Sequence, residues 1–250
     1  MKRETVMKKI NWVITSFLMG VLLVSLSCDD KSRSFGSFGI DIATVISEGD
    51  NTYSLLLDNG KYLWPAATAI PYTPSHGQRV FLNYTILSEE MGGYDHYVRV
   101  NEMWNILTKK AIKLTAQNAD SIGNDPVKAN AMWVGGDYLN VSFMFNYGGV
   151  QPHAINLVDT QLEPGSDSKT IDLEFRHNAY GSTLTKLYEG FVCFDLKPMR
   201  VEEADSIKLS IKVKEWTGDK TYDVVYRYNQ PTGTTRAEMP IPVISSNQYY

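Results

Sequence analysis

Histidines are the first residues in this chain whose chemistry could build a site. The four histidines are His76, His96, His153 and His177, and no two of them show the spacing of roughly three to five residues that is typical of metal ligands. His177, followed by Asn178, is the best candidate for a polar site, although a lone histidine more often serves as a hydrogen-bonding core residue. We therefore expect no metal, no cofactor and no catalytic residue among the histidines.

Carboxylates are the residues of this sequence that could serve as the catalytic groups of a hydrolase. Glu89-Glu90 and Glu202-Glu203 are adjacent pairs, and adjacent side chains on a strand point to opposite faces, so neither pair can flank one glycosidic bond. A hydrolase would need two carboxylates from separate segments within about 5 to 10 Å of each other. The candidates for such a pair are Asp137, Glu174, Asp195 and Glu215.

Other enzyme motifs are missing from the sequence. No Gly-x-Ser-x-Gly nucleophile elbow occurs, and Gly135-Gly136 lacks the pattern of a phosphate-binding loop. We therefore expect that the chain is not an enzyme, and an envelope glycan hydrolase is the alternative that remains.

The two cysteines, Cys28 and Cys193, lie in different surroundings. Cys193 falls in an apolar run over residues 190–195, where a thiol usually acts as a small buried hydrophobe. Cys28 follows a basic segment, an apolar stretch over residues 10–24 and Ser25-Leu26-Ser27, which is the order of a secretory signal peptide. The stretch is shorter than the about 20 apolar residues of a transmembrane helix.

The segment that ends at Cys28 resembles a bacterial lipobox, in its relaxed form similar to those of Bacteroidetes lipoproteins. The resemblance implies that residues 1–27 are a removable signal peptide, that Cys28 carries the lipid, and that Cys193 has no disulfide partner. Residues 28–37, rich in Ser and Gly, then form a flexible tether. The lipid would anchor the protein in the outer membrane, on its periplasmic or cell-surface side.

Composition excludes one class of partner. The chain is 43% hydrophobic and 12% aromatic, as expected for a folded protein. Removal of residues 1–27 takes away four basic residues and one acid, which leaves 20 basic against 27 acidic residues. Because phosphate binding requires concentrated Lys and Arg, we expect no nucleic-acid partner.

Hydrophobic alternation predicts an all-β protein with two domains. Five strand patterns, at residues 38–47, 52–57, 79–87, 97–106 and 110–114, predict a five-stranded OB-like barrel over residues 38–114. The apolar pattern is lost over residues 115–126, which we interpret as a linker. Seven further strand patterns over residues 127–230 predict an immunoglobulin-like β-sandwich, and residues 231–250 an extended tail.

Aromatic residues are the most abundant side chains in this sequence that could bind a ligand. Tyr62, Trp64 and Tyr72 form a row that could stack on sugar rings or grip a loop of a partner protein. Core packing is the alternative for the same residues, because aromatic side chains dominate β cores. We expect Trp133, with Tyr138 nearby, to anchor the core between the two sheets of the sandwich.

The motif Asp-Ser-Ile occurs at residues 120–122 and again at 205–207. It resembles the acceptor motif for O-glycosylation in Bacteroidetes. The resemblance implies that Ser121 and Ser206 are possible glycosylation sites. Ser121 lies in the predicted linker.

Three segments of the second domain carry a wider resemblance. They are Trp-Val-Gly-Gly-Asp-Tyr-Leu-Asn-Val at 133–141, Leu-Glu-Phe-Arg-His-Asn-Ala-Tyr at 173–180 and Phe-Val-Cys-Phe-Asp-Leu at 191–196. Together with the signal they resemble the NigD-like lipoproteins of Bacteroidetes, in which an N-terminal OB-type domain precedes a C-terminal β-sandwich. The family's link to a bacteriocin gene cluster implies an immunity or accessory role.

The sequence therefore predicts a membrane-anchored lipoprotein that acts as a non-enzymatic binding module for an unknown protein or glycan partner. An immunity or accessory lipoprotein of a bacteriocin system is the alternative that the family resemblance supplies.

Overall fold

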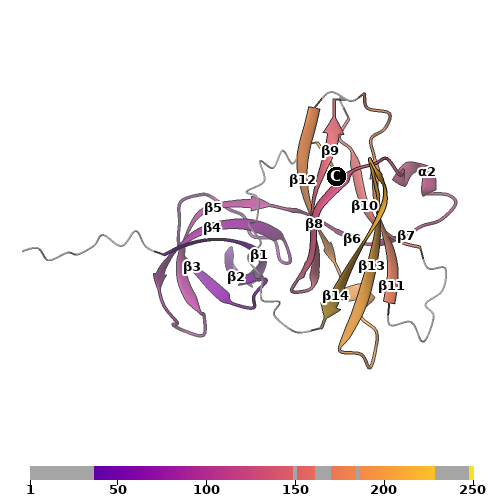
Figure 1. Ribbon diagram of the computed structural model, residues 1–250. Helices are drawn as coiled ribbons and strands as arrows, with labels where there is room; N and C mark the ends of the chain where they lie inside the picture. The colour runs from indigo at the N-terminus through magenta and orange to yellow at the C-terminus, as the bar shows by residue number, and fades with distance from the viewer. Residues whose placement is uncertain (1–36, 149–150, 161–169, 184–185, 229–247) are drawn as a thin grey trace, which may run out of the picture. The chain divides into compact units, whose positions relative to one another are not determined.

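The computed structural model describes residues 37–148, 151–160, 170–183, 186–228 and 248–250 (Figure 1). Within these ranges the chain is built almost wholly from strands, with one short α-helix, α2 (Ala119–Ile122), and one 3-10 helix, η1 (Lys197–Met199). The predicted all-β fold is confirmed. The predicted signal peptide, Cys28 and the tether up to residue 36 lie outside the described residues. None of the helices in the described ranges is both long and apolar enough to span a membrane.

Five strands close into a barrel in the order β1-β2-β3-β5-β4. Their bounds are β1 (Phe38–Gly49), β2 (Thr52–Leu57), β3 (Tyr62–Thr68), β4 (Arg79–Ser88) and β5 (His96–Asn105). Neighbours are antiparallel except β3 and β5, which run parallel. Alternate side chains point inward, so that Val45, Leu55 and Leu82 are buried in the barrel interior. The predicted OB-like barrel is confirmed.

The third barrel strand is not the one that the alternation predicts. β3 contains Pro65, which has no N–H to donate to a ladder and therefore does not read as a strand. The structure accommodates Pro65 at a shift in the register between β3 and β5. Residues 110–114, predicted as the fifth barrel strand, belong instead to the second domain.

The passage between the domains accordingly lies earlier than predicted. β6 (Leu107–Lys110) and β7 (Ile112–Lys113) follow directly on β5 and pair with strands of the sandwich. The predicted linker at 115–126 contains α2, whose carbonyls at Asp120 and Ser121 accept hydrogen bonds from the side chain of Asn178. This segment is therefore part of the second domain and does not join the two domains.

Two sheets make up the second domain, as predicted for a β-sandwich. One has the order β14-β13-β11-β10-β7 and the other the order β6-β12-β9-β8. Both sheets are mixed, because β6–β12, β7–β10 and β11–β13 are parallel pairs. The remaining bounds are β8 (Lys128–Gly135), β9 (Tyr138–Tyr147), β10 (Ala154–Asp159), β11 (Thr170–Asn178), β12 (Lys186–Asp195), β13 (Ser206–Glu215) and β14 (Gly218–Arg227).

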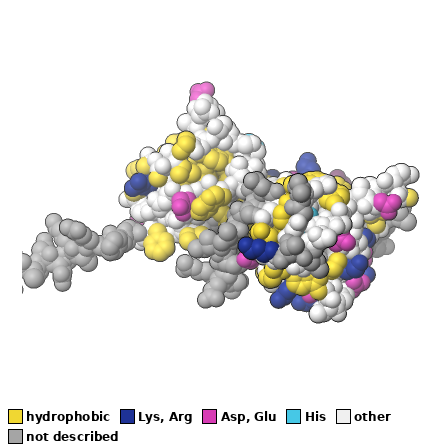
Figure 2. All heavy atoms as spheres, turned by 90° about the horizontal axis from the view of Figure 1, so that it is seen from above, with side chains coloured by type: hydrophobic (Ala, Val, Ile, Leu, Met, Phe, Trp, Pro, Cys, Tyr) yellow, Lys and Arg dark blue, Asp and Glu magenta, His cyan; other side chains and the backbone are white. Residues whose placement is uncertain are grey.

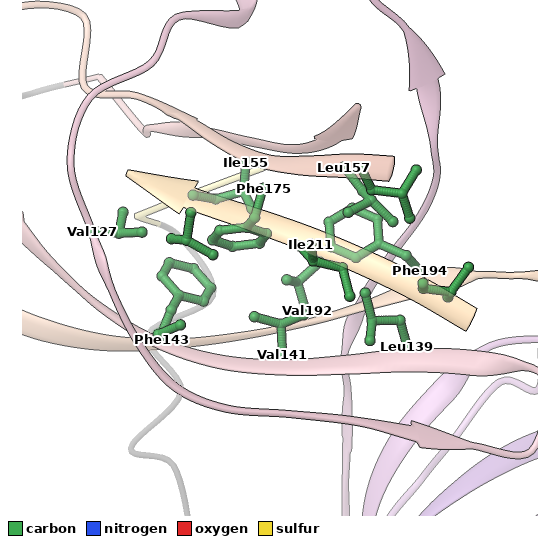
Figure 3. Close-up of a cluster of buried hydrophobic side chains, with 14 of the residues drawn as sticks. Val127, Leu139, Val141, Phe143, Ile155, Leu157, Phe175, Val192, Phe194 and Ile211 are labelled. Carbon is green, nitrogen blue, oxygen red and sulfur yellow. The ribbon is translucent and has the colours of Figure 1, made fainter. Parts of the chain in front are cut away.

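Side chains from the two sheets meet in one hydrophobic core. Val141 and Phe143 from β9 point toward Phe175 of β11 and Ile211 of β13 (Figure 3). Along β13 the buried positions alternate with exposed lysines such as Lys208, so one face of this strand is buried in the core and the other faces solvent. The alternation in the sequence thus gives the orientation of this sheet correctly.

β9 and β12 are buried on both faces, because the barrel covers the outer side of their sheet. Phe191 and Cys193 of β12 form a cluster with Ile42 and Phe81 of the barrel. The rings of Phe81 and Phe191 meet edge to face, with centroids 4.7 Å apart. Trp133 packs onto Phe191 in this same cluster, at 5.6 Å, so its predicted place between the two sheets is wrong.

A buried ion pair lies beside that cluster. Arg79 is 1% exposed, and its Nη1 lies 2.7 Å from Oδ1 of Asp58. The guanidinium also donates to Oγ1 of Thr44 at 2.9 Å and to Oδ1 of Asn140 at 3.2 Å, and it lies over the ring of Tyr138. Since Asn140 and Tyr138 belong to β9, the sandwich completes the environment of a barrel cation.

The carboxylate of this pair is held from the sandwich as well. Asn140 Nδ2 donates to Oδ2 of Asp58 at 3.0 Å. A side chain at Gly135 would overlap the Asp58 carboxylate and would lie 2.6 Å from Asn140 Nδ2. Gly135 is therefore required for the close approach of Asp58 to β8, which explains a glycine that no phosphate-binding role accounts for.

Replacing the buried cation should destabilise the whole fold. In Arg79→Met the Asp58 carboxylate stays buried without its cation, and we expect a loss of about 3 to 5 kcal/mol in the free energy of unfolding. Urea denaturation followed by tryptophan fluorescence measures it. As a matched control, Lys212→Met removes one partner of the exposed pair with Asp219 and should leave the midpoint unchanged. Equal effects of the two substitutions would contradict the role given to Arg79.

Candidate functional site

His177 and Asn178, predicted as a polar site, support the sandwich from within. His177 is 2% exposed, and its Nε2 lies 2.8 Å from Nδ1 of the equally buried His153, so one ring donates a hydrogen bond to the other. Asn178 holds α2 through the two carbonyls described above. This geometry fits the hydrogen-bonding interpretation of His177.

The two imidazoles are held in their neutral forms. Burial, together with a smaller effect of the neighbouring His153, lowers the pKa of His177 to about 4, against a smaller opposing influence of Asp125. Burial also lowers the pKa of His153. Phe145 and Tyr147 pack their rings against His153, which keeps water and charge away from the pair.

Cys193 has the properties of a buried core thiol. It is fully buried, and its Sγ lies 3.0 Å from Oδ1 of Asn140, to which it donates. Burial raises the pKa of the thiol to about 11, although Arg79 nearby lowers it. A thiolate is therefore scarce at neutral pH, and the thiol is neither exposed nor activated as a nucleophile would need to be.

The predicted aromatic row is divided between two places on the barrel. Tyr72 packs against Tyr53, with ring centroids 5.6 Å apart, on the residues of the barrel interior. Tyr62 and Trp64 lie on the outer face of β3, separated by the buried Leu63. Core packing thus describes Tyr72, whereas Tyr62 and Trp64 face outward.

Trp64 belongs to a cluster of half-buried rings on the outside of the barrel. Its ring centroid lies 5.0 Å from that of Tyr94 and 6.5 Å from that of Tyr97, and the two tyrosines are 6.1 Å apart. Tyr62, 40% exposed, lies two residues before Trp64 on the same face of the strand. We call Tyr62, Trp64, Tyr94 and Tyr97 the aromatic surface.

The loop between β4 and β5 positions Tyr94 on this surface. Met91 and Tyr94 exchange two backbone hydrogen bonds of 3.1 Å, which close a tight turn over Gly92 and Gly93. Gly92 has φ +62°, and a Cβ there would lie 2.9 Å from the Tyr97 hydroxyl. The glycine therefore allows the turn to pack directly onto the aromatic surface.

Charged and polar groups border the aromatic surface. Asp95 accepts a hydrogen bond of 2.7 Å from the backbone N–H of Tyr62. Glu89 lies 3.4 Å from His96, and Lys61 lies 3.3 Å from the same imidazole. Figure 2 shows hydrophobic side chains exposed on the barrel. An apolar platform with hydrogen-bonding groups at its edge suits a ligand with both apolar faces and hydroxyls.

The carboxylates proposed for a hydrolase each have structural partners. Asp137 binds Arg200 at 2.6 Å and accepts from the Tyr226 hydroxyl, and Glu174 pairs with Arg176. The other two candidates are occupied in similar ways: Glu215 accepts from Tyr222, and Asp195 accepts from the backbone of Lys197. Among the described residues, no three His, Cys, Asp or Glu side chains are grouped as a metal site would require.

Both Asp-Ser-Ile motifs present their serine to solvent. Ser121 lies in α2, where its hydroxyl donates to the carbonyl of Asn118, and Ser206 is the first residue of β13. Ile122 and Ile207, the third residues of the motifs, are each 3% exposed. Each serine is thus accessible while its isoleucine anchors the segment in the domain.

Sequence reasoning missed three parts of this arrangement. Tyr94 and Tyr97 reach Trp64 only through the parallel pairing of β3 with β5, which places Trp64 opposite Tyr97. The buried Arg79 carried a signal, because this arginine is the one charged residue of β4 and directly precedes three apolar residues. Tyr249, in the predicted tail, is 4% exposed and lies in the sandwich core, so the end of that segment is not simply extended on the surface.

The sequence matches two family descriptions over adjacent segments. Residues 42–106 match the NigD-like N-terminal OB domain, and residues 110–226 match the NigD-like C-terminal beta sandwich domain. These two segments meet where β5 gives way to β6 and β7, in agreement with the structural boundary. No curated protein matches the sequence significantly.

Solved structures of proteins from Parabacteroides and Bacteroides have a similar fold. A protein described as toxin-related from Parabacteroides distasonis is 37% identical, with a TM-score of 0.68, over 77% of this chain and 95% of its own. A protein of unknown function from Bacteroides vulgatus is 31% identical, also with a TM-score of 0.68, over 85% and 98%. A NigD-like immunity protein from Bacteroides caccae, at 20% identity and a TM-score of 0.58 over 76% and 92%, shows the fold alone.

The neutral histidine pair predicts a pH dependence of stability. In the unfolded chain a histidine binds a proton below about pH 6.5, whereas folded His177 binds one only below about 4. The unfolded state therefore binds more protons between these values, and the free energy of unfolding should fall by about 3 kcal/mol as the pH is lowered from 7 to 4.

Substitution at His177 separates this dependence from that of the carboxylates. His177→Gln should flatten the decrease of stability between pH 6.5 and 4 in urea titrations. His76→Gln, at an exposed histidine, should keep the slope of the unchanged protein. If His177→Gln retains the full slope, the histidine pair does not titrate as described.

Proposed function

Because the chain belongs to the NigD-like family, we propose that it is a cell-envelope lipoprotein, anchored through Cys28, that acts as a non-enzymatic binding module for a glycan. The aromatic surface on the barrel is the observation that carries this proposal. OB-type barrels commonly bind oligosaccharides or oligonucleotides across strands two and three and the loop that joins strands four and five. Tyr62 and Trp64 on β3 and Tyr94 in the β4–β5 loop occupy these positions.

The charges around the aromatic surface favour a glycan over a nucleic acid. Glu48 is close enough to Tyr94 to raise its pKa, together with the larger effect of burial, and Glu89 and Asp95 border the same surface. A phosphate backbone would be repelled by these carboxylates. A neutral sugar meets no such repulsion, and its hydroxyls can use the carboxylates as acceptors.

The non-enzymatic part of the proposal is supported by what the reactive groups do. The buried thiol of Cys193 is held protonated, and the carboxylates named for a hydrolase bind cations or backbone groups of the fold. Each of these groups has a structural role that explains its presence.

An immunity or accessory role in a toxin system is the second candidate. It is favoured by the relative described as toxin-related, which is 37% identical and matches over nearly its full length. This candidate keeps the anchor and the binding role, but its ligand would be a polypeptide. The ligand therefore separates the two candidates.

Removing the central ring of the aromatic surface should weaken glycan binding. We expect the protein expressed without residues 1–28 to bind one class of neutral glycan on an array, and Trp64→Ala to weaken that binding at least about tenfold, or about 1.4 kcal/mol. Calorimetry with the glycan identified measures the affinity. Trp104→Ala, at another partly exposed barrel tryptophan, is the matched control and should bind normally.

Three results would contradict the glycan proposal. Equal binding by Trp64→Ala and Trp104→Ala would remove the aromatic surface as the site. Capture of a toxin polypeptide with no glycan bound would favour the immunity role. Binding of single-stranded oligonucleotides would show that the acidic border does not exclude phosphates.

The anchor has a separate test. Cells grown with labelled palmitate should incorporate the label into the unchanged protein but not into Cys28→Ala, since acylation follows modification of that cysteine. Cys193→Ala, which removes the buried thiol, should still be labelled. A label that persists in Cys28→Ala would refute anchoring through this residue.

A further inference from the structure

Residues 248–250 add a short strand to the five-stranded sheet beside His153. The N–H of His153 donates to the carbonyl of Gln248 at 2.7 Å, and the N–H of Tyr250 donates to the carbonyl of His153 at 2.8 Å. A third bond of 2.7 Å joins the N–H of Ile155 to the carbonyl of Tyr250. Since β11 occupies the other edge of β10, the added strand lies on the same side as β7.

Tyr249, the central residue of this strand, fills a pocket between the two sheets. Its ring packs edge-on against Phe143 and Phe145, with centroids 5.5 and 5.8 Å away. Its hydroxyl donates to the carbonyl of Phe191 at 2.8 Å and accepts from the N–H of the same residue at 2.9 Å. Both polar functions of the phenol are thus matched at the bottom of an apolar pocket, which selects tyrosine over phenylalanine.

Tyr250 fixes the end of the strand at the surface. Its ring stacks on Tyr180 with an interplanar angle of 12°, and the two hydroxyls are in contact. Lys109 lies 5.9 Å from the centre of the Tyr250 ring, while its ammonium donates to the carbonyl of Ile155. These contacts add a second aromatic requirement next to the buried tyrosine.

We propose that the edge formed by His153 and the first residues of β10, as far as Ile155, is a strand-addition site for an extended peptide with the sequence tyrosine-tyrosine, and that residues 248–250 are its resident occupant. Main-chain hydrogen bonds along a sheet edge supply affinity in such sites, and pockets for alternate side chains supply specificity. Here the ladder is the set of three bonds at His153 and Ile155, and the pocket is the one filled by Tyr249.

The host of this site is complete without its occupant. Phe143 is paired with Gly190 and Phe191 with Ser142 in the β9–β12 ladder, and Ile155 is paired with His177 in β11. Three described residues, 248–250, form the occupant, and the contacts named above join them to residues of the host between Lys109 and Phe191. A tethered occupant acts at an effective concentration on the order of millimolar, so a peptide in trans must compete with it. This inference does not depend on the proposed glycan site.

The experiment vacates the site in the full chain and offers the peptide separately. In Tyr249→Ala the resident strand loses its buried ring, and a fluorescein-labelled peptide of residues 245–250 should bind at least tenfold more tightly than it binds the unchanged protein, as measured by fluorescence anisotropy. Trp104→Ala, at a partly exposed barrel tryptophan outside both proposed sites, is the control and should behave as the unchanged protein. The same peptide with alanine or phenylalanine in place of Tyr249 should bind at least tenfold more weakly.

Backbone amide exchange distinguishes strand addition from adherence elsewhere. The amides of His153, Ile155 and Phe191 should exchange faster in Tyr249→Ala and regain protection when the peptide is added. If Tyr249→Ala is unfolded, the peptide should restore its circular dichroism and raise its melting temperature. The proposal is overturned if the peptide neither binds nor rescues Tyr249→Ala, if it binds without protecting these amides, or if it binds the unchanged protein equally well.

Discussion

The buried pair of Arg79 and Asp58 is the interaction on which the rest of this structure depends. A charge taken out of water costs several kcal/mol unless it is paired and its remaining donors are hydrogen-bonded. The barrel supplies Asp58 and Thr44, and Asn140 from β9 adds another hydrogen-bond acceptor for the guanidinium. The barrel cation therefore gains this acceptor only against a folded sandwich, and the apolar outer faces of β9 and β12 are covered by the same contact. One polar network and one hydrophobic cluster thus specify the same junction.

The sequence predicted those parts of the fold in which hydrophobic alternation is strong. β1, β2, β4 and β5, and the seven sandwich strands from β8 to β14, follow the predicted ranges closely, because apolar residues alternate with a period of two in most of them and form a continuous run in β12. β3 was not predicted, because Pro65 is unfavourable within a strand. The structure accommodates Pro65 at a shift in the register between β3 and β5. Residues 107–113 have the composition of a strand, but their assignment to the sandwich depends on parallel partners 46 to 85 residues away, which alternation cannot identify.

The sequence predicted the residue types of the candidate site, but it did not predict which of these residues lie together. Tyr62 and Trp64 were predicted together with Tyr72 as one aromatic row, and nothing in their spacing separates them from Tyr72, which packs inward. The partners of Trp64 come from β5 and its preceding turn, so they are brought together by the barrel closure. For His177, the polar neighbours in the sequence suggested a site. In the structure its hydrogen-bond partner is instead His153, across the β10–β11 pair. Long-range pairing decided each outcome.

Phe191 shows how closely the separate features are connected. Its side chain meets Phe81 of the barrel, while its backbone N–H and carbonyl both bind the hydroxyl of Tyr249. The preceding Gly190 lies directly against the ring of Phe143, where a side chain would overlap it, so β12 can pack this closely only with glycine at that position. A single strand therefore touches the barrel on one face and the strand-addition pocket on the other. Because packed interiors have little free volume, β12 must keep one fixed position to satisfy both contacts, and this requirement explains why its apolar run is continuous instead of alternating.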